Sequence, residues 1–162
     1  MNGCPKFERL VLKPLSGHVL EVTLNRVSKL NAFDGLMWEE VKACFEWIER
    51  EAVDCRVVLL SAAGRLFTAG VDLETFSSVA EEGDDDIARS GLRIFHTGRV
   101  WQEAFSVIAR CSKVVIACTH NACIGAGLEM ISACDIRFCT SDCYFVYKEA
   151  DVGCKYDCCF VS

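Results

Sequence analysis

The chain has 162 residues, 52% of them hydrophobic, which is the length of one domain built around one core. Its formal net charge of -6 lacks the electrostatic footprint of a nucleic-acid binder, which needs clustered Lys and Arg, so we expect no nucleic-acid partner. Its apolar runs are far shorter than the roughly 20 residues that cross a bilayer, so we predict no membrane span.

The first half of the chain predicts a strand, a helix and a second strand. Residues 18–24 follow a Ser-Gly pair and are rich in branched apolar side chains, which favours a strand. Asp34 is expected to cap a helix over residues 36–52, where apolar side chains recur every three or four residues. Residues 56–61 are continuously apolar in their centre, which predicts a strand in a sheet covered on both faces.

The second half continues this order. The acidic run 81–86 predicts a solvated loop whose aspartates precede a helix over residues 87–110. Next we expect a strand at 113–118, a short helix at 125–133 and another strand at 136–139. The order lacks the alternation of a Rossmann fold, and no internal repeat or interdomain linker is visible.

Twelve cysteines could indicate a disulfide scaffold or a zinc site. The chain contains no Cys-x-x-Cys, and its three histidines do not pair with the cysteines in a recognised pattern. No secretion signal is visible either. We therefore predict no metal site and expect most of the cysteines to be small buried thiols.

Two glycine-containing segments follow predicted strands and are candidates for binding a ligand through backbone N–H groups. Residues 64–72 contain small residues where a backbone must approach something closely. Residues 121–129 open the short helix, so its first N–H groups would be free to stabilise an anion or a developing oxyanion. Each segment alone is also typical of an ordinary strand exit or helix start.

Glu129 and Glu149 are candidates for proton transfer. Glu129 lies three residues after Ala126, so a helix would place both on the same side. Two carboxylates brought together in an apolar pocket would raise the pKa of at least one toward the range useful for general acid or base work. For each, a solvated surface glutamate is the alternative.

The motifs together resemble the crotonase superfamily of enoyl-CoA hydratases and isomerases in order and spacing. The likeness covers about residues 7–153 and is greatest to the Δ3,5-Δ2,4-dienoyl-CoA isomerases, whose signature resembles residues 148–153. It implies an α/β fold, the crotonase-like ββα superhelix, with a core over 1–153 and a divergent tail over 154–162. The matching runs are Asn25-Arg26, Asn31-Ala32, Phe67-Thr-Ala-Gly-Val-Asp72, Cys123-Ile-Gly-Ala-Gly-Leu-Glu129 and Ala133-Cys-Asp-Ile-Arg137.

The resemblance implies an oxyanion hole made by the backbone N–H groups of Val71 and Ala126. Position 126 is usually Gly in the family, and Ala restricts the backbone angles. By the same resemblance Glu149 removes a proton, Asp157 returns one at the far end of the diene, and Glu129 positions or balances them. The residues implied in substrate binding are Ala69, Gly70, Asp72, Gly125 and Gly127.

The resemblance further implies isomerisation of 3,5-dienoyl-CoA to 2,4-dienoyl-CoA in fatty-acid β-oxidation. An acyl-CoA would be the substrate, with no separate cofactor or metal, in a trimer or hexamer located in a peroxisome or mitochondrion. No targeting signal is visible in this chain.

Two alternatives remain open. The pair of Glu129 and Glu149 also fits an enoyl-CoA hydratase, which adds water to a 2-enoyl-CoA. Family members also continue beyond residue 162 into helices that cover the acyl pocket and make trimer contacts. An inactive, truncated fragment that binds CoA esters or associates with other subunits is therefore the alternative from another class.

Overall fold

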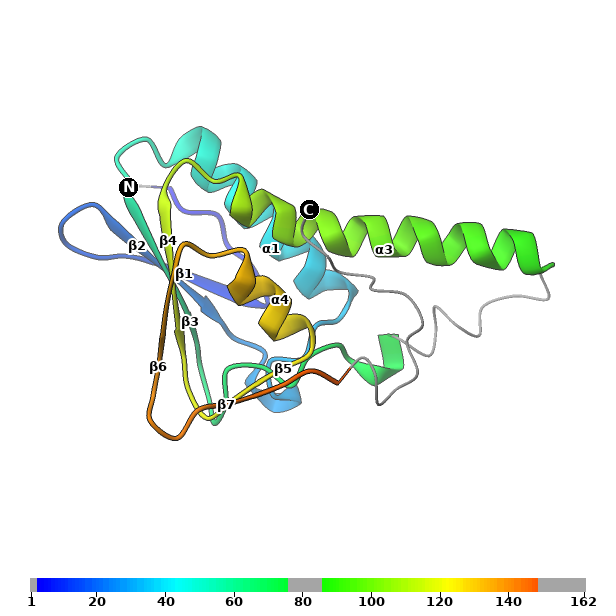
Figure 1. The fold of residues 1–162 in the computed structure, drawn as a ribbon. Helices are drawn as coiled ribbons and strands as arrows, with labels where there is room; N and C mark the ends of the chain where they lie inside the picture. Colours follow the sequence, from blue (N-terminus) through cyan, green and yellow to red (C-terminus); the bar gives the residue numbers. More distant parts are fainter. Residues whose placement is uncertain (1–2, 76–85, 149–162) are drawn as a thin grey trace.

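The structure, a computed structural model, describes residues 3–75 and 86–148, and its main feature is a sheet of five strands (Figure 1). The strand order is β1-β2-β3-β4-β6. β1 pairs with β2 antiparallel, and the other neighbours pair parallel. The strands are β1 (Leu10–Pro14), β2 (Val19–Leu24), β3 (Val57–Ala62), β4 (Val114–Thr119) and β6 (Ile136–Cys139).

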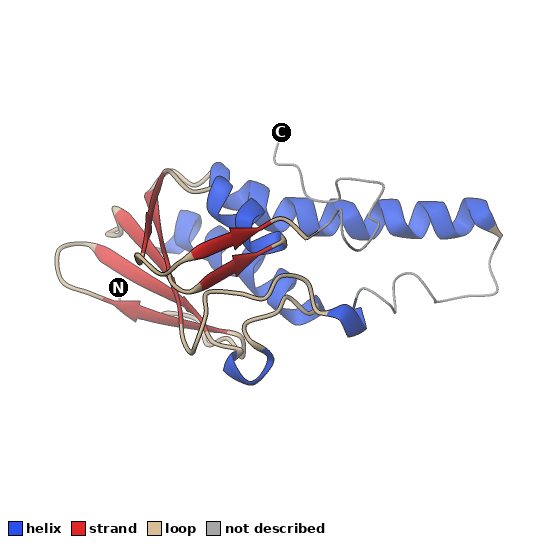
Figure 2. Ribbon diagram, turned by 60° about the horizontal axis from the view of Figure 1, so that its bottom comes forward, coloured by secondary structure: helices blue, strands red, loops and turns tan. Residues whose placement is uncertain are grey.

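The other elements form two further layers around the core. The two strands β5 (Ala122–Ile124) and β7 (Tyr144–Val146) pair parallel in a second, small sheet beside the large one (Figure 2). The helices lie on one side of the large sheet (Figure 1). They are α1 (Gly35–Glu51), α3 (Ile87–Ala109) and α4 (Ala126–Ser132), preceded by the short 3-10 helix η1 (Val27–Lys29).

Successive turns of the chain run from the large sheet through the second layer into a helix. β2 leads through Phe33 to α1, and β4 leads through β5 to α4. Isolated parallel bridges extend the second layer beyond its two strands, joining Phe33 to Val71 and Thr68 to Cys123. This arrangement is a ββα superhelix, so the fold class predicted from the sequence is confirmed.

The core lies between the helices and one face of the large sheet. An aromatic cluster occupies it, in which Trp38 stacks on Trp101 with ring centroids 5.2 Å apart. The prediction that both faces of the sheet are covered is wrong for the part of the chain that the structure describes. β2 and β3 alternate buried and half-buried residues, and all four residues of β6 are exposed, including Phe138 at 61%.

The helix α3 begins where the sequence predicts, and Asp86 caps it by accepting hydrogen bonds from the N–H groups of Ala88 and Arg89. Its first half projects away from the sheets (Figure 1), and Phe95 there is 62% exposed. The four buried residues of this helix fall between Trp101 and Ile108. Residues 81–85 of the predicted acidic loop lie outside the described residues.

The described cysteines range from buried to exposed thiols, and we expect their reactivity to follow burial. Burial raises the pKa of Cys123 to about 12 and that of Cys44 further, whereas Cys139 is exposed. With an aromatic disulfide reagent at mildly alkaline pH, Cys139 should react in the folded protein, and Cys44 only after denaturation. Peptide mass spectrometry would follow each site, and equal rates at both would contradict the burial of Cys44.

Candidate oxyanion site

The two glycine-containing segments predicted from the sequence lie side by side. Thr68 N–H donates to the carbonyl of Ala122 at 3.2 Å, and the Ile124 N–H donates to the carbonyl of Thr68 at 3.2 Å. Gly70 then turns with a φ of +91°, and a Cβ added there would lie 3.0 Å from the Ile124 carbonyl oxygen. A side chain at position 70 would therefore separate the segments.

The N–H of Val71 points away from its bridge partner. Phe33 donates its N–H to the Gly70 carbonyl at 2.8 Å and accepts the Asp72 N–H at 3.0 Å, so it bonds the residues on either side of Val71. In a parallel bridge the central residue directs its own N–H to the opposite side. No hydrogen bond from the Val71 N–H reaches any residue within 3–75 or 86–148.

Ala126 supplies a second free donor. It is the first residue of α4, where an N–H has no partner inside the helix, and no other described residue accepts from it. Gly125 fixes the helix start, since its N–H donates to the Val146 carbonyl at 2.9 Å and its carbonyl accepts the Leu128 N–H at 2.8 Å. Ala126 is fully buried and has a helical backbone that alanine adopts readily, so the unusual residue is accommodated.

Gly127 lets α4 approach the first segment. A Cβ at this position would lie 2.3 Å from the Thr68 Cγ2 and 3.0 Å from the Cys123 Sγ. Thr68 is fully buried, and its hydroxyl donates to the Asn31 carbonyl at 2.7 Å and accepts the Gly70 N–H at 3.1 Å. The packing of Gly127 on Thr68 therefore sets the spacing between the N–H groups of Val71 and Ala126.

Asn31 holds the start of the first segment. Asn31 is 1% exposed, and its Nδ2 lies within hydrogen-bond distance of three carbonyl oxygens of residues 63–67. Its Oδ1 accepts the Arg26 N–H at 2.9 Å. From the sequence, Asn31 was identified only as a match in the resemblance, and its supporting role was not predicted.

Asp72 is among the residues implied in substrate binding, and the structure places its carboxylate beside Arg26. The Oδ2 of Asp72 lies 2.6 Å from the Arg26 Nη1, and its Oδ1 accepts the Glu74 N–H at 3.1 Å. The Arg26 guanidinium holds the pKa of the Asp72 carboxyl below its ordinary value. The roles of Ala69, Gly70, Asp72, Gly125 and Gly127 in substrate binding stay predictions.

The lowered pKa of Asp72 predicts a pH-dependent contribution to stability. The unfolded carboxyl has a pKa of about 3.9. Between that pH and the lower pKa of the folded state, the unfolded state binds more protons than the folded state. The contribution should be complete above about pH 4 and lost as the pH falls through the folded pKa. We expect Asp72→Asn to be less stable than the wild type at neutral pH, with the difference shrinking in acid. Urea unfolding across pH would test this, and a constant difference would contradict it.

Of the three acids predicted to act in proton transfer, the structure describes Glu129. Glu129 lies in the first turn of α4, is half-buried, and has its Oε2 shielded from solvent. Glu149 and Asp157 lie outside the described residues, as does the proposed boundary at 153. β7 ends at Val146, whose carbonyl accepts the N–H of Gly125, the residue before Ala126.

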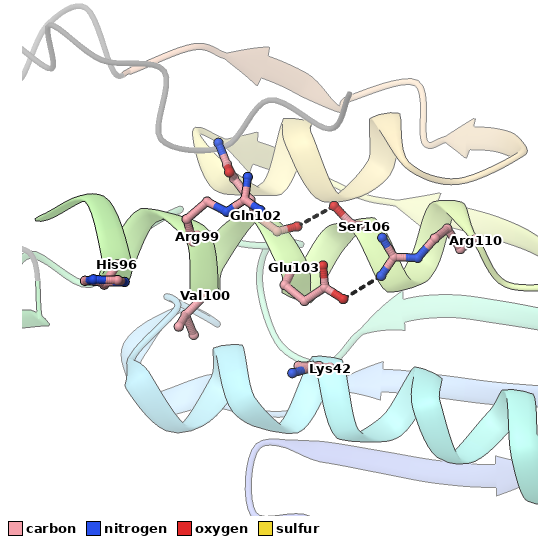
Figure 3. A pocket seen from close by; sticks show the side chains of 8 residues that line it. All are labelled: Lys42, His96, Arg99, Val100, Gln102, Glu103, Ser106 and Arg110. Atoms are coloured by element: carbon pink, nitrogen blue, oxygen red, sulfur yellow. Dashed lines mark hydrogen bonds and ion pairs between the residues drawn. The ribbon is translucent and has the colours of Figure 1, made fainter. Parts of the chain in front are cut away.

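A groove of about 500 Å³ between α1 and α3 lies elsewhere and is a poor candidate for this chemistry (Figure 3). Two of its cations already have acidic partners: Arg110 contacts Glu103 at 2.5 Å and Lys42 contacts Glu46 at 3.8 Å. Neither glycine-containing segment contributes to its lining. The lining residues are Lys42, His96, Arg99, Val100, Gln102, Glu103, Ser106 and Arg110.

Within residues 3–75 and 86–148, no group of three or more His, Cys, Asp or Glu side chains could hold a metal ion. None of the described helices has the length and apolar character needed to span a bilayer.

A ββα superhelix in which two adjacent segments carry N–H groups without an acceptor among the described residues has the architecture of the crotonase class of folds. The chain belongs to the enoyl-CoA hydratase/isomerase family, since the model of that family matches residues 15–162.

Individual proteins agree with this family. The chain is 44% identical over 152 residues to a human mitochondrial Δ3,5-Δ2,4-dienoyl-CoA isomerase, covering 93% of this chain and 46% of that protein. It is 34% identical over 146 residues to a peroxisomal enzyme of the same name from Arabidopsis thaliana, covering 89% and 52%. An enoyl-CoA hydratase/isomerase structure from Marinobacter aquaeolei matches with a TM-score of 0.80 and 26% identity, over 90% of this chain and 54% of that one. The chain thus spans about half the length of these relatives.

Proposed function

We propose that the chain carries the thioester-activating part of an acyl-CoA double-bond isomerase, which converts 3,5-dienoyl-CoA to 2,4-dienoyl-CoA. The observation that carries the proposal is the pair of N–H groups of Val71 and Ala126, which lie on adjacent segments and have no acceptor among the described residues. Such donors stabilise negative charge more strongly than water does, because they are already oriented when the charge develops. The names of the human and Arabidopsis relatives support the isomerase reaction.

The thioester carbonyl oxygen would accept hydrogen bonds from both N–H groups. Loss of a proton from C2, next to the carbonyl, then gives an enolate whose charge extends along the diene to C6. In the proposed roles Glu149 takes the C2 proton, Asp157 delivers a proton to C6, and Glu129 positions or balances these two acids. Return of the electrons leaves the double bonds at C2 and C4, so atoms and charge balance.

The proposal is tested by turnover. Purified protein should convert a 3,5-dienoyl-CoA to the conjugated 2,4-dienoyl-CoA, which is followed by the rise in ultraviolet absorbance. Glu149→Gln removes the base and should lower the rate about a hundredfold or more. Glu51→Gln, an exposed residue at the end of α1, is the matched control and should retain the rate. A rate unchanged by Glu149→Gln would exclude the proposed base.

The hydratase reaction is the second candidate, because Glu129 on α4 and Glu149 could act as a pair on water. Loss of absorbance of a 2-enoyl-CoA, without any change of a 3,5-dienoyl-CoA, would favour it. Binding of both esters without turnover of either would favour the fragment that binds CoA esters or other subunits.

We further propose a mitochondrial or peroxisomal location, in line with the names of the relatives, and a trimeric or hexameric assembly with acyl-CoA as the substrate.

A further inference from the structure

The direction of the Val71 N–H depends on two segments that lie far apart in the sequence. Phe33 bonds to Gly70 and Asp72, the residues on either side of Val71, at 2.8 and 3.0 Å. These two bonds turn the Val71 N–H away from Phe33. Any movement of the Phe33 segment relative to residues 70–72 would therefore change the direction of the Val71 N–H.

The side chain of Arg26 joins these two segments. Its Nη1 donates to the Ala32 carbonyl at 3.0 Å and to the Asp72 Oδ2 at 2.6 Å, and its Nε pairs with the Asp34 Oδ2 at 3.0 Å. One guanidinium thus contacts the residues on both sides of Phe33 and the residue that follows Val71. The Arg26 side chain is 13% exposed, so water screens these contacts little.

We propose that Arg26 is a positioning residue for the oxyanion hole, because it holds the Phe33 and Asp72 segments together and so aims the Val71 N–H at the thioester oxygen. The inference rests on the proposed function for the identity of the ligand. Lysine could not replace it, since a guanidinium is a planar fork with five donors and an ammonium is a point charge on a flexible stem.

A substitution of Arg26 is expected to disturb Asp72 more than Asp34. Asp34 keeps a second cation when Arg26 is altered, because the Arg9 Nη2 lies 3.1 Å from the same Oδ2. Among the described residues, Lys29 is the one further cation that lowers the pKa of Asp72. The loss of Arg26 contacts therefore falls mainly on Asp72 and on the neighbouring Val71.

The test measures the infrared carbonyl band of a bound enoyl-CoA that carries 13C at the thioester carbon. Hydrogen bonds from the hole weaken the C=O bond, so in the wild type the band should move to lower frequency on binding. In Arg26→Lys the band should move by about half as much or less, while affinity for the ester changes little. Arg50→Lys, on the exposed end of α1, is the matched control and should retain the full shift. A full shift in Arg26→Lys would overturn the inference.

A second variant separates positioning from a folding defect. Arg26→Met combined with Asp72→Leu removes both charges, so no buried charge is left without a partner. This protein should fold and show the reduced shift, and a full shift in it would also overturn the inference.

The ligand-free protein provides a result that does not depend on the proposed function. The amide resonance of Val71 in a 15N correlation spectrum should move more in Arg26→Lys than in Arg50→Lys. If the wild type binds no ester, the proposed function fails, and the resonance alone then decides the inference. A Val71 resonance that stays in place would overturn it.

Discussion

Replacing Asn31 with alanine is expected to lower the free energy of unfolding by about 3–5 kcal/mol. The substitution would leave the carbonyl oxygens of Ala63, Leu66 and Phe67 without the Nδ2 donor that now lies 2.8–3.2 Å away. It would also remove the acceptor of the Arg26 N–H. Buried polar groups that lose their partner each cost about 1–3 kcal/mol. Chemical denaturation would measure the loss.

Two variants separate the hydrogen bonds of Asn31 from its backbone conformation. Asn31 has a φ of +53°, which costs alanine about 1–2 kcal/mol, and Asn31→Gly removes that part of the loss. Asn121→Ala is the matched control, because Asn121 has a φ of +56° and its side chain makes no hydrogen bond to the described residues. Equal losses for Asn31→Ala and Asn121→Ala would show that the Asn31 side chain contributes nothing.

Replacing Gly127 with alanine is expected to cost about 3 kcal/mol of stability and to weaken binding of a CoA ester. The new Cβ would lie 2.3 Å from the Thr68 Cγ2, and Thr68 cannot move easily because its hydroxyl makes two hydrogen bonds. The strain should therefore push α4 and the Ala126 N–H away from the first segment. Denaturation and calorimetric titration with an enoyl-CoA would measure the two effects.

A compensating change and a control sharpen this prediction. Thr68→Ser removes the Cγ2 but keeps the hydroxyl, so the double variant Gly127→Ala/Thr68→Ser should recover most of the loss. Gly91→Ala introduces the same group on α3, where the new Cβ would meet no described atom within 4 Å beyond its chain neighbours and its own helix backbone, and should raise stability by about 0.5–1 kcal/mol. Failure of the double variant to recover would place the strain elsewhere.

The helices could be predicted from the sequence because their signals are local. The helix predicted at 36–52 is α1, Gly35–Glu51, and the one predicted at 87–110 is α3, Ile87–Ala109. Asp34 caps α1 as expected, accepting the Met37 N–H at 2.9 Å. Apolar periodicity and a capping side chain both lie within the element itself, so no tertiary information is needed.

Three strands were missed because distant pairing defines them. β5 and β7 have three residues each, too few for a period to appear. β1 is an edge strand that contains Lys13 and ends at Pro14. Glu40 shows the same limit within a helix: it is buried because its carboxylate accepts the backbone N–H groups of Glu8 and Arg9, far away in the sequence.

In the candidate site, too, some residues could be predicted from the sequence and others could not. Val71 and Ala126 were identified by resemblance, and their role in an oxyanion hole stays a prediction; no described residue accepts a hydrogen bond from either N–H group. Other residues orient these donors through contacts between segments many residues apart. They are Arg26, Asn31 and Thr68. Composition and spacing carry no signal of such contacts.

The parallel pairing of the large sheet also bears on how fast the chain folds. Each parallel neighbour, from β2 to β6, is reached through a crossover that contains a helix, so no two of them can be joined by a tight turn. The loops must close before the sheet contacts compensate the lost chain entropy. α1 and α3 should therefore form early, and refolding should take milliseconds to seconds rather than the microseconds of a helical bundle.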